Sequence, residues 1–348
     1  MIKFIIIFIL CFPLTSYSAV VFEDNFDGYT WNTTGVYDDV ECTQTTGVKC
    51  AQAPGDWTNI RNLPAVSSTP WMQINSLPSS GTDHTTGGTG GHALIVKYPA
   101  QEYTGDCMLS KMLTSQYPEL YAQVWIKSQP GGMTLNSNSS NNKMFRLMGI
   151  IPGCDNFYSY FSGGCADSIV FNDFGTYWTG TNIAGWVPSI RCGPNSSNYY
   201  CSGTIDNYDW AGAKACGSTS CTDQATASGQ WNDGNWHRIT IHVKMNTSTS
   251  LSNGIYEVTY DGQTQIMHDG TPANLTDIQY LKTGSGITGW NAVSLGGNSF
   301  GTAALSWMAY DDLVISTTPI AADYVPGGGG ASPSSRLTGG TLSGCRIN

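Results

Sequence analysis

Short runs in which apolar and polar residues alternate recur along the chain and predict β-strands. In the clearest run, residues 236–246 (WHRITIHVKMN), the apolar residues Ile239, Ile241 and Val243 occupy every second position. Successive side chains of a strand point to opposite faces, so such a run buries one face and exposes the other. Further runs of this kind are residues 92–98 (HALIVKY), 120–127 (LYAQVWIK), 255–260 (IYEVTY) and 306–316 (SWMAYDDLVIS). We find no convincing helix of ten or more residues, and the pattern predicts an all-β protein.

Two segments break this rhythm. Residues 255–260 keep the alternation and lead into Asp261 and Gly262, a strong hairpin turn signal. The first segment that breaks the alternation, from about 152 to 235, is rich in Gly, Ser, Asn and Cys. That segment predicts disulfide-pinned loops, or a small subdomain, rather than regular strands. Residues 326–348 begin with PGGGG and have the composition of a linker or tail. We therefore expect one domain over residues 20–325, with an insert at about 152–235 and a Gly/Ser-rich tail.

The first 19 residues predict export. A short basic start, an apolar run over residues 4–14 and small residues up to Ala19 have the order of a secretory signal peptide. The apolar run is shorter than the roughly 20 residues that span a bilayer. We therefore expect cleavage after Ala19, a secreted mature protein and no membrane association after cleavage.

The cysteine count is consistent with an oxidising compartment. The sequence has 11 cysteines, and Cys11 leaves with the signal peptide, so an even number remains. Disulfide bonds are favoured over a metal site, because no CxxC motif or adjacent histidine is present. A simple hypothesis pairs cysteines that are close in sequence and leaves Cys107 with Cys345, although the spacing does not determine the connectivity.

Composition and charge narrow the function classes. Charged residues make up 11% of the 348 residues, against roughly 25% in an average soluble domain, and the net charge is −10. A coiled coil, a helical repeat array and a charged disordered chain are thereby excluded. Broad electrostatic capture of nucleic acid is not expected, because phosphate binding requires a basic surface.

Four segments follow one another in a recognisable order: residues 21–28 (VFEDNFDG), 235–246 (NWHRITIHVKMN), 253–262 (NGIYEVTYDG) and 309–316 (AYDDLVIS). In this order they resemble the concanavalin A-like jelly-roll superfamily, in the branch that includes polysaccharide lyases and LamG-like glycan-binding domains. The resemblance implies a two-sheet antiparallel β-sandwich, a jelly roll with the disulfide-rich loop insertion described above. Its motifs are specific for the fold and say little about activity, because the same motifs occur in lectins and in lyases.

Three function classes are compatible with this resemblance. The first is a polysaccharide lyase that performs β-elimination on a uronate-containing glycan, and the second is a glycan-binding module without chemistry. The third, a glycoside hydrolase, is disfavoured because the E-x-D-x-x-E pattern is absent and no Glu has a second Glu nearby in sequence. We favour the lyase and expect an acidic polysaccharide as partner, with no cofactor required.

Strand parity supplies the candidate residues. A lyase needs a group that neutralises the sugar carboxylate, a base for the C5 proton and an acid for O4. We assign these catalytic tasks to Lys244, His242 and Tyr121, whose strand faces carry cations and aromatic rings without a carboxylate inside the two runs. Residues predicted to bind substrate in the same concave groove or beside it are Gln123, Trp125, Lys127, Lys143, Arg146 and Arg238. An alternative is that this polar face is only the solvated side of the sandwich.

The first and last predicted strands carry acidic residues. Related jelly rolls bind a structural calcium ion at such strand ends, and the resemblance therefore implies Asp24 and Asp312 as calcium ligands. Turn and capping roles for these aspartates are the alternative.

Overall fold

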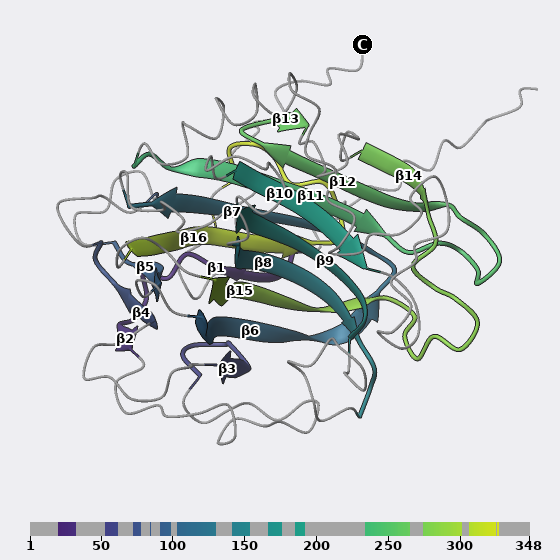
Figure 1. Ribbon diagram of the computed structural model, residues 1–348, viewed down its shortest axis with the longest axis horizontal. Coiled ribbons are helices and arrows are strands. Elements are labelled where there is room, and N and C mark those ends of the chain that lie inside the picture. Colours follow the sequence, from purple (N-terminus) through teal and green to yellow (C-terminus); the bar gives the residue numbers. More distant parts are fainter. Residues whose placement is uncertain are drawn as a thin grey trace, which may run out of the picture.

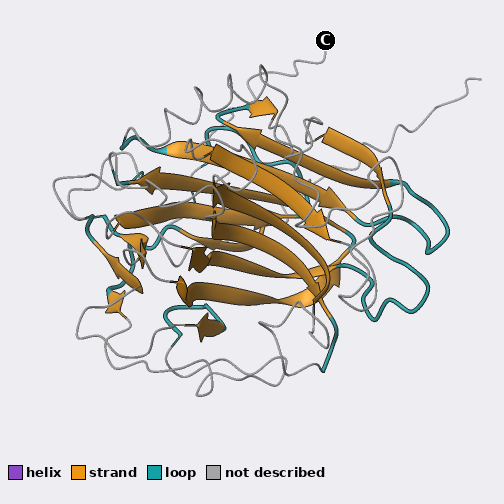
Figure 2. Ribbon diagram, viewed as in Figure 1, coloured by secondary structure: helices purple, strands orange, loops and turns teal. Residues whose placement is uncertain are grey.

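The computed structural model describes residues 20–32, 53–61, 72–77, 84, 91–98, 103–129, 141–153, 166–175, 185–191, 234–264, 274–300, 306–324 and 326. Every regular element in this part of the chain is a β-strand, and the strands form two antiparallel sheets packed face to face (Figures 1 and 2). The predicted all-β sandwich is confirmed. No helix among the described residues is long and apolar enough to cross a membrane. The predicted signal peptide, the predicted local cysteine pairs and almost all of the tail lie outside the described residues.

The larger sheet has ten strands in the described part of the chain. Its main path runs in the order β13-β12-β11-β7-β16-β5-β4-β2, while β1 pairs with β16 and β14 pairs with β12. The strands are β1 (Val20–Asp24), β2 (Trp31–Asn32), β4 (Met72–Asn75), β5 (Ala93–Tyr98), β7 (Glu119–Ser128), β11 (His237–Lys244), β12 (Gly254–Tyr260), β13 (Gln263–Thr264), β14 (Asn274–Ile278) and β16 (Ser306–Ser316).

The smaller sheet has six described strands in the order β10-β9-β8-β15-β6-β3. They are β3 (Asn59–Arg61), β6 (Tyr103–Tyr117), β8 (Asn141–Ile150), β9 (Ala166–Gly175), β10 (Gly185–Arg191) and β15 (Trp290–Phe300). Strands β9 and β10 pair over seven residues inside the segment expected to be irregular. The expectation of loops without regular strands is therefore wrong for these two stretches, whose hydrogen bonds and sheet partners outweigh their Gly- and Ser-rich surroundings.

The core lies between the sheets and follows the predicted alternation. Residues of β11 are alternately buried and half-buried, with Ile239, Ile241 and Val243 in the core. They pack in one cluster with residues from the other sheet such as Leu147 and Leu295. The apolar side of β11 therefore faces the opposite sheet, and its polar side faces outward. By contrast, β16 is buried along its whole length, and a second apolar cluster contains Ala93, Ile95, Trp307 and Ala309.

The turn between β12 and β13 matches its sequence signal. Asp261 and Gly262 have φ angles of 49° and 80°, so both central residues are left-handed. This is the backbone conformation that a two-residue hairpin turn requires. Asp261 also accepts a hydrogen bond from the backbone N–H of Arg238 at 2.8 Å, which fixes the start of β11.

Candidate functional site

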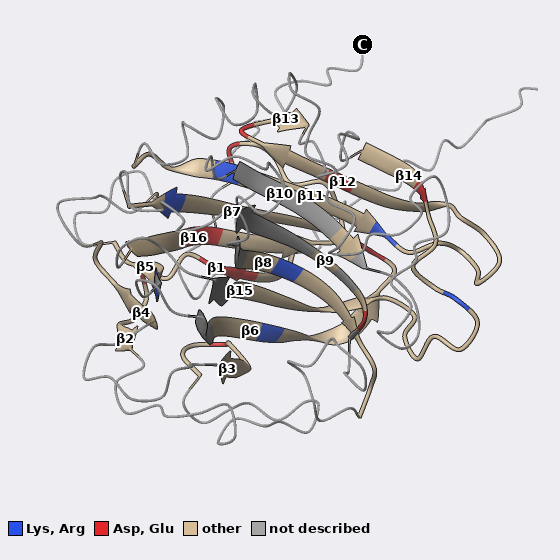
Figure 3. Ribbon diagram, in the orientation of Figure 1, with Lys and Arg blue, Asp and Glu red and all other residues tan. Residues whose placement is uncertain are grey.

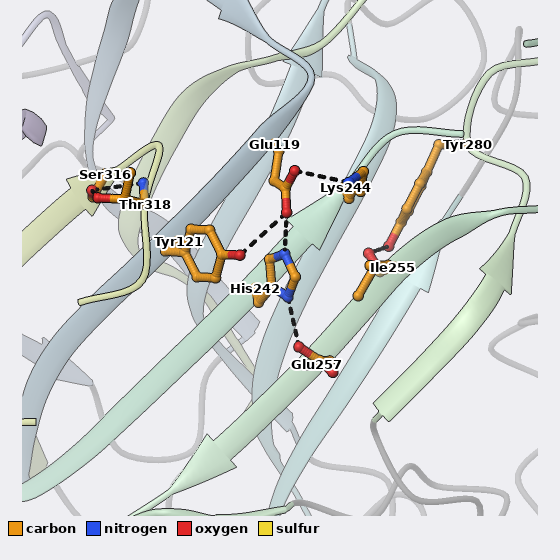
Figure 4. A network of polar contacts seen from close by, with 9 residues as sticks. All are labelled: Glu119, Tyr121, His242, Lys244, Ile255, Glu257, Tyr280, Ser316 and Thr318. Carbon is orange, nitrogen blue, oxygen red and sulfur yellow. Dashed lines mark hydrogen bonds and ion pairs between the residues drawn. The ribbon is translucent and has the colours of Figure 1, made fainter. Parts of the chain in front are cut away.

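Strand register brings the three predicted catalytic residues together on the outer face of the ten-stranded sheet. Strand β11 lies antiparallel to β7, with His242 opposite Tyr121 and Lys244 opposite Glu119. The rings of Tyr121 and His242 stack with centroids 4.1 Å apart and planes 6° from parallel. These side chains and the carboxylates beside them form one polar network, called the Glu119 cluster below (Figure 4). The cluster consists of Glu119, Tyr121, His242, Lys244 and Glu257.

Glu119 contacts all three predicted catalytic side chains. Its Oε1 accepts a hydrogen bond from the Tyr121 hydroxyl at 3.2 Å and lies 2.9 Å from His242 Nε2. Its Oε2 pairs with Lys244 Nζ at 3.0 Å. Glu119 was not among the predicted site residues, because it immediately precedes the alternating run at residues 120–127. Glu119 lies two residues before Tyr121 and therefore on the same strand face, which is the signal that could have identified it.

His242 lies between two carboxylates. Nδ1 is 2.6 Å from Glu257 Oε2 on β12, and Nε2 faces Glu119 on β7. An ionised carboxylate only accepts hydrogen bonds, and only the imidazolium form has two N–H groups. Both ring nitrogens of His242 are therefore taken up by carboxylate contacts, and one contact has to be released before a ring nitrogen has a lone pair available.

The surroundings change the pKa values of two members of the cluster. Burial, together with the negative charge of Glu119, raises the pKa of Tyr121 to about 12. Burial also acts to raise the pKa of Glu119, but hydrogen bonds from His242 and Lys244 outweigh it and leave the pKa below its usual value. At neutral pH Tyr121 therefore keeps its proton, and Glu119 is a carboxylate.

The prediction that this face carries cations without carboxylates is wrong, because the same contacts pair each cation of the cluster with a glutamate. Within the cluster, Lys244 and His242 each contact a carboxylate that the two sequence runs did not contain. Glu119 immediately precedes one run, and Glu257 is brought opposite His242 by the β11–β12 register. Figure 3 shows that red and blue positions on the strands are sparse. Two glutamates distant in sequence thus flank one imidazole, which sequence proximity could not reveal.

Gln123 and Arg238 lie beneath the segment that follows β16, the last described strand. We call residues 317–324 the C-terminal strap. Gln123 is 1% exposed and donates a long hydrogen bond of 3.4 Å from Nε2 to the backbone carbonyl of Tyr324. Arg238 Nη1 donates to the carbonyl of Ala322. Both predicted binding residues are therefore on the expected face, and their donors are directed at main-chain oxygens.

Trp125 and Lys127 lie farther along β7 in an aromatic cluster. The His84 ring stacks on Trp125 with centroids 3.6 Å apart, and the Arg238 guanidinium lies 6.0 Å from the centre of the Trp125 ring. Lys127 Nζ lies 5.7 Å from the centre of the Trp236 ring. The histidine stack covers one face of Trp125, which limits its use as an open platform for sugar rings.

Lys143 and Arg146 lie in the other sheet. Both belong to β8, whereas Tyr121 and His242 belong to β7 and β11 of the ten-stranded sheet. Arg146 is fully buried, with Nη1 2.7 Å from the Met108 sulfur. For Lys143 only the backbone position is described. The expectation that Arg146 shares one groove with Trp125 and Lys244 is wrong, because the β8 run pairs with β15 and β9 and not with β7.

The two predicted calcium ligands have different partners. The Asp24 carboxylate accepts hydrogen bonds from the Tyr29 hydroxyl at 2.5 Å, Trp57 Nε1 at 2.7 Å and the Phe26 N–H at 2.7 Å. Burial raises the pKa of this carboxyl. Binding a cation through Asp24 would require breaking these bonds, so Asp24 fits the role poorly.

Asp312 has surroundings that fit a cation better. It is fully buried with φ of 47°, its Oδ2 contacts His84 Nδ1 at 2.6 Å, and its Oδ1 has no hydrogen-bond partner among the described residues. The neighbouring Asp311 has its pKa raised by burial and by the Asp312 charge. In the described part of the chain, no group of three or more His, Cys, Asp or Glu side chains could hold a metal ion. The calcium site stays a prediction.

Comparison with known proteins gives a likeness only among solved structures. No family model matches the chain, and no curated protein matches it. The alginate lyase Aly36B is 12% identical with a TM-score of 0.44, over 86% of this chain and 96% of that one. The alginate lyase vAL-1 from Chlorella virus is 12% identical with a TM-score of 0.45, over 76% and 94%. The cellulose induced protein Cip1 is 9% identical with a TM-score of 0.37, over 84% and 98%. Likeness at this level carries no function over, so any function has to be argued from the residues of this chain.

Proposed function

We propose that this chain is a polysaccharide lyase that performs β-elimination on a uronate-containing glycan at the Glu119 cluster. One observation carries the proposal: the Tyr121 hydroxyl and the His242 imidazole are stacked and both bonded to the same oxygen, Oε1 of Glu119. A proton donor and a proton acceptor are thereby held side by side on a rigid pair of strands. Elimination requires such a pair, because a base removes the proton on C5 while an acid protonates O4 on the neighbouring C4 of the same sugar.

His242 takes the role of base in its neutral form. With its proton on Nε2 and donated to Glu119, the lone pair on Nδ1 is the basic atom. Nδ1 faces Glu257, whose side chain is 45% exposed and has room to turn toward solvent. The sugar C5 proton then moves to Nδ1, and the electrons of the C5–H bond form the C4–C5 double bond.

Tyr121 takes the role of acid. As the C4–O4 bond breaks, O4 takes the phenolic proton, and the phenolate later regains a proton from the medium. A pKa raised to about 12 keeps Tyr121 protonated until the leaving oxygen needs the proton. Lys244 is the cation available to the C6 carboxylate, and it has to exchange part of its 3.0 Å contact with Glu119 for the substrate.

Ultraviolet spectroscopy tests this function directly. The full chain is incubated with alginate, polyglucuronate and pectate, and the absorbance of the unsaturated product is followed. We expect product from at least one polymer and a rate lowered by about 100-fold or more in His242→Asn, the range for an acid–base group. Thr259→Val, a change on the same face of β12 outside the cluster, is the matched control. Absence of unsaturated product from all three polymers would refute the lyase proposal.

A glycan-binding module without chemistry is the second candidate. It is favoured by the aromatic cluster, where Trp125 and Trp236 lie within 5.7–6.0 Å of the cations Lys127 and Arg238. Aromatic faces and cations together suit an acidic sugar. Binding of oligouronates to a protein that produces no unsaturated product would support this candidate.

A further inference from the structure

The C-terminal strap crosses the outer face of the ten-stranded sheet beside the Glu119 cluster. Gln123 follows Tyr121 by two residues on the same face of β7, and Thr240, which follows Arg238 by two on β11, is opposite Gln123. Gln123 is therefore the next residue on this face after the predicted acid Tyr121, and Arg238, which is opposite Trp125, lies one step farther along the same face. Any glycan that extends along β7 from Tyr121 toward Trp125 would meet the strap first.

The strap presents main-chain oxygens to these donors. The carbonyl of Tyr324 accepts from Gln123, and the carbonyl of Ala322 accepts from Arg238. These are neutral acceptors, whereas the planar fork of a guanidinium binds a carboxylate more strongly and through two donors. Arg238 Nε is shielded from solvent and has no hydrogen-bond partner among the described residues. The charge of Asp261 interacts with Arg238, but Asp261 Oδ1 accepts from the Arg238 backbone N–H, so a sugar carboxylate would give the guanidinium a charged hydrogen-bond partner that the strap carbonyls do not supply.

Five of the eight strap residues are exposed, and Tyr324 makes contacts that fasten the end of the strap. The Tyr324 hydroxyl donates to Glu23 Oε2 at 2.6 Å, and the Tyr324 N–H donates to the Ala321 carbonyl at 3.0 Å. Thr318, Pro319, Ala321, Ala322 and Asp323 are all exposed. The described part of the strap therefore adds little to the core, and its release would leave the sandwich intact.

We infer that Arg238 and Gln123 form a uronate subsite and that the C-terminal strap covers it, so that the chain is held in a low-affinity state until the strap moves away. The strap oxygens stand in for the oxygens of an acidic sugar. This inference rests on the proposed function for the class of ligand, but it concerns binding and does not require turnover.

Two variants of the full chain test the inference. Tyr324→Ala removes the hydroxyl that binds Glu23, and a second variant combines it with Glu23→Gln. Hydrogen exchange of the amides of residues 317–324 measures strap release, and calorimetry measures the affinity for an alginate trisaccharide. Thr318→Ala is the matched control, because its side chain contacts only Ser316 among the described hydrogen bonds.

We expect faster exchange over the strap and a trisaccharide affinity at least about tenfold higher, which corresponds to about 1.4 kcal/mol. Faster exchange with unchanged affinity would overturn the inference, as would slow exchange in both variants or no trisaccharide binding by either. Tighter binding without unsaturated product would uphold the subsite and refute the lyase. If unsaturated product forms, but the elimination rate and the affinity are the same with the strap held or released, the lyase is upheld and the covered subsite is refuted.

Discussion

The carboxylate of Glu119 and the imidazole of His242 are joined across two strands by a contact of 2.9 Å between Oε1 and Nε2. The two residues are 123 positions apart in sequence. The antiparallel register of β7 and β11 places them diagonally, since His242 is opposite Tyr121 and Glu119 is opposite Lys244. This one contact orders a base, an acid and a cation around a single carboxylate, and the first two predictions follow from it.

Tyr121 should ionise later than an ordinary tyrosine. Its pKa is raised to about 12 by burial and by Glu119, against an ordinary value of about 10. The difference between the ultraviolet pH titrations of the native chain and Tyr121→Phe isolates this residue. We expect a midpoint near 12, and a shift back toward 10 in Glu119→Gln. A midpoint near 10 in the otherwise native chain would contradict the described contact.

Glu119 should make stability depend on pH in the acid range. Its folded pKa is lowered, so its stabilising contribution is present above the unfolded pKa of about 4.3 and is lost as pH falls through the folded pKa. Between about pH 5 and about pH 3, a range set by that unfolded pKa, urea unfolding should show a weaker loss of stability in Glu119→Gln than in the native chain.

At neutral pH the same substitution should cost about 1 kcal/mol or less, because the partners are partly exposed. Asp56→Asn, an exposed residue outside the cluster, serves as control. Identical pH profiles for the native chain and Glu119→Gln would show that the cluster does not contribute to folding stability.

The sequence predicts the local features of the fold, but it does not predict which strands pair across long distances in the chain. The alternation of residues 236–246 predicted the two faces of β11, and Asp261–Gly262 predicted the turn, because both depend on neighbours in sequence. Arg146 was assigned to the wrong sheet because its strand has the same local pattern as β7. Only pairing between strands far apart in the chain decides which sheet a run joins.

The partners of His242 illustrate the same limit. Its outward direction follows from parity, but Glu257 becomes its neighbour only through the β11–β12 register. The C-terminal strap was also unpredicted, because its contacts with Gln123 and Arg238 use backbone carbonyls and leave no mark in the side-chain pattern.

Asp24 should be required for stability. It accepts hydrogen bonds from Tyr29 and from Trp57, and Trp57 is fully buried. Asp24→Ala leaves these donors without an acceptor, and we expect a loss of about 2–4 kcal/mol of unfolding free energy. Tyr29→Phe removes only one of the bonds and should cost about 1 kcal/mol. The measurement is urea unfolding, and equal losses for the two variants would contradict this account.

Gly296 should not tolerate a side chain. Its φ is 78°, and a Cβ there would lie 2.2 Å from the carbonyl oxygen of Cys107 on β6. Both the left-handed backbone and the close approach penalise Gly296→Ala, and we expect a loss of about 1–3 kcal/mol or more. Gly28→Ala is the matched control, because nothing lies within 4 Å of its Cβ position. A thermal unfolding midpoint equal to that of the control would refute the described approach of β15 to β6.

The position of β16 has a consequence for how the protein folds. This strand lies between β7 and β5 and also pairs with β1, yet it is the last strand described along the chain. Until residues 306–316 have been synthesised, β7 and β5 cannot be bridged and β1 lacks its described partner. Such long-range pairing slows folding and exposes strand edges that can pair with other chains. The chain should therefore depend on protection from aggregation during synthesis, and acquire its native sandwich only after β16 is available.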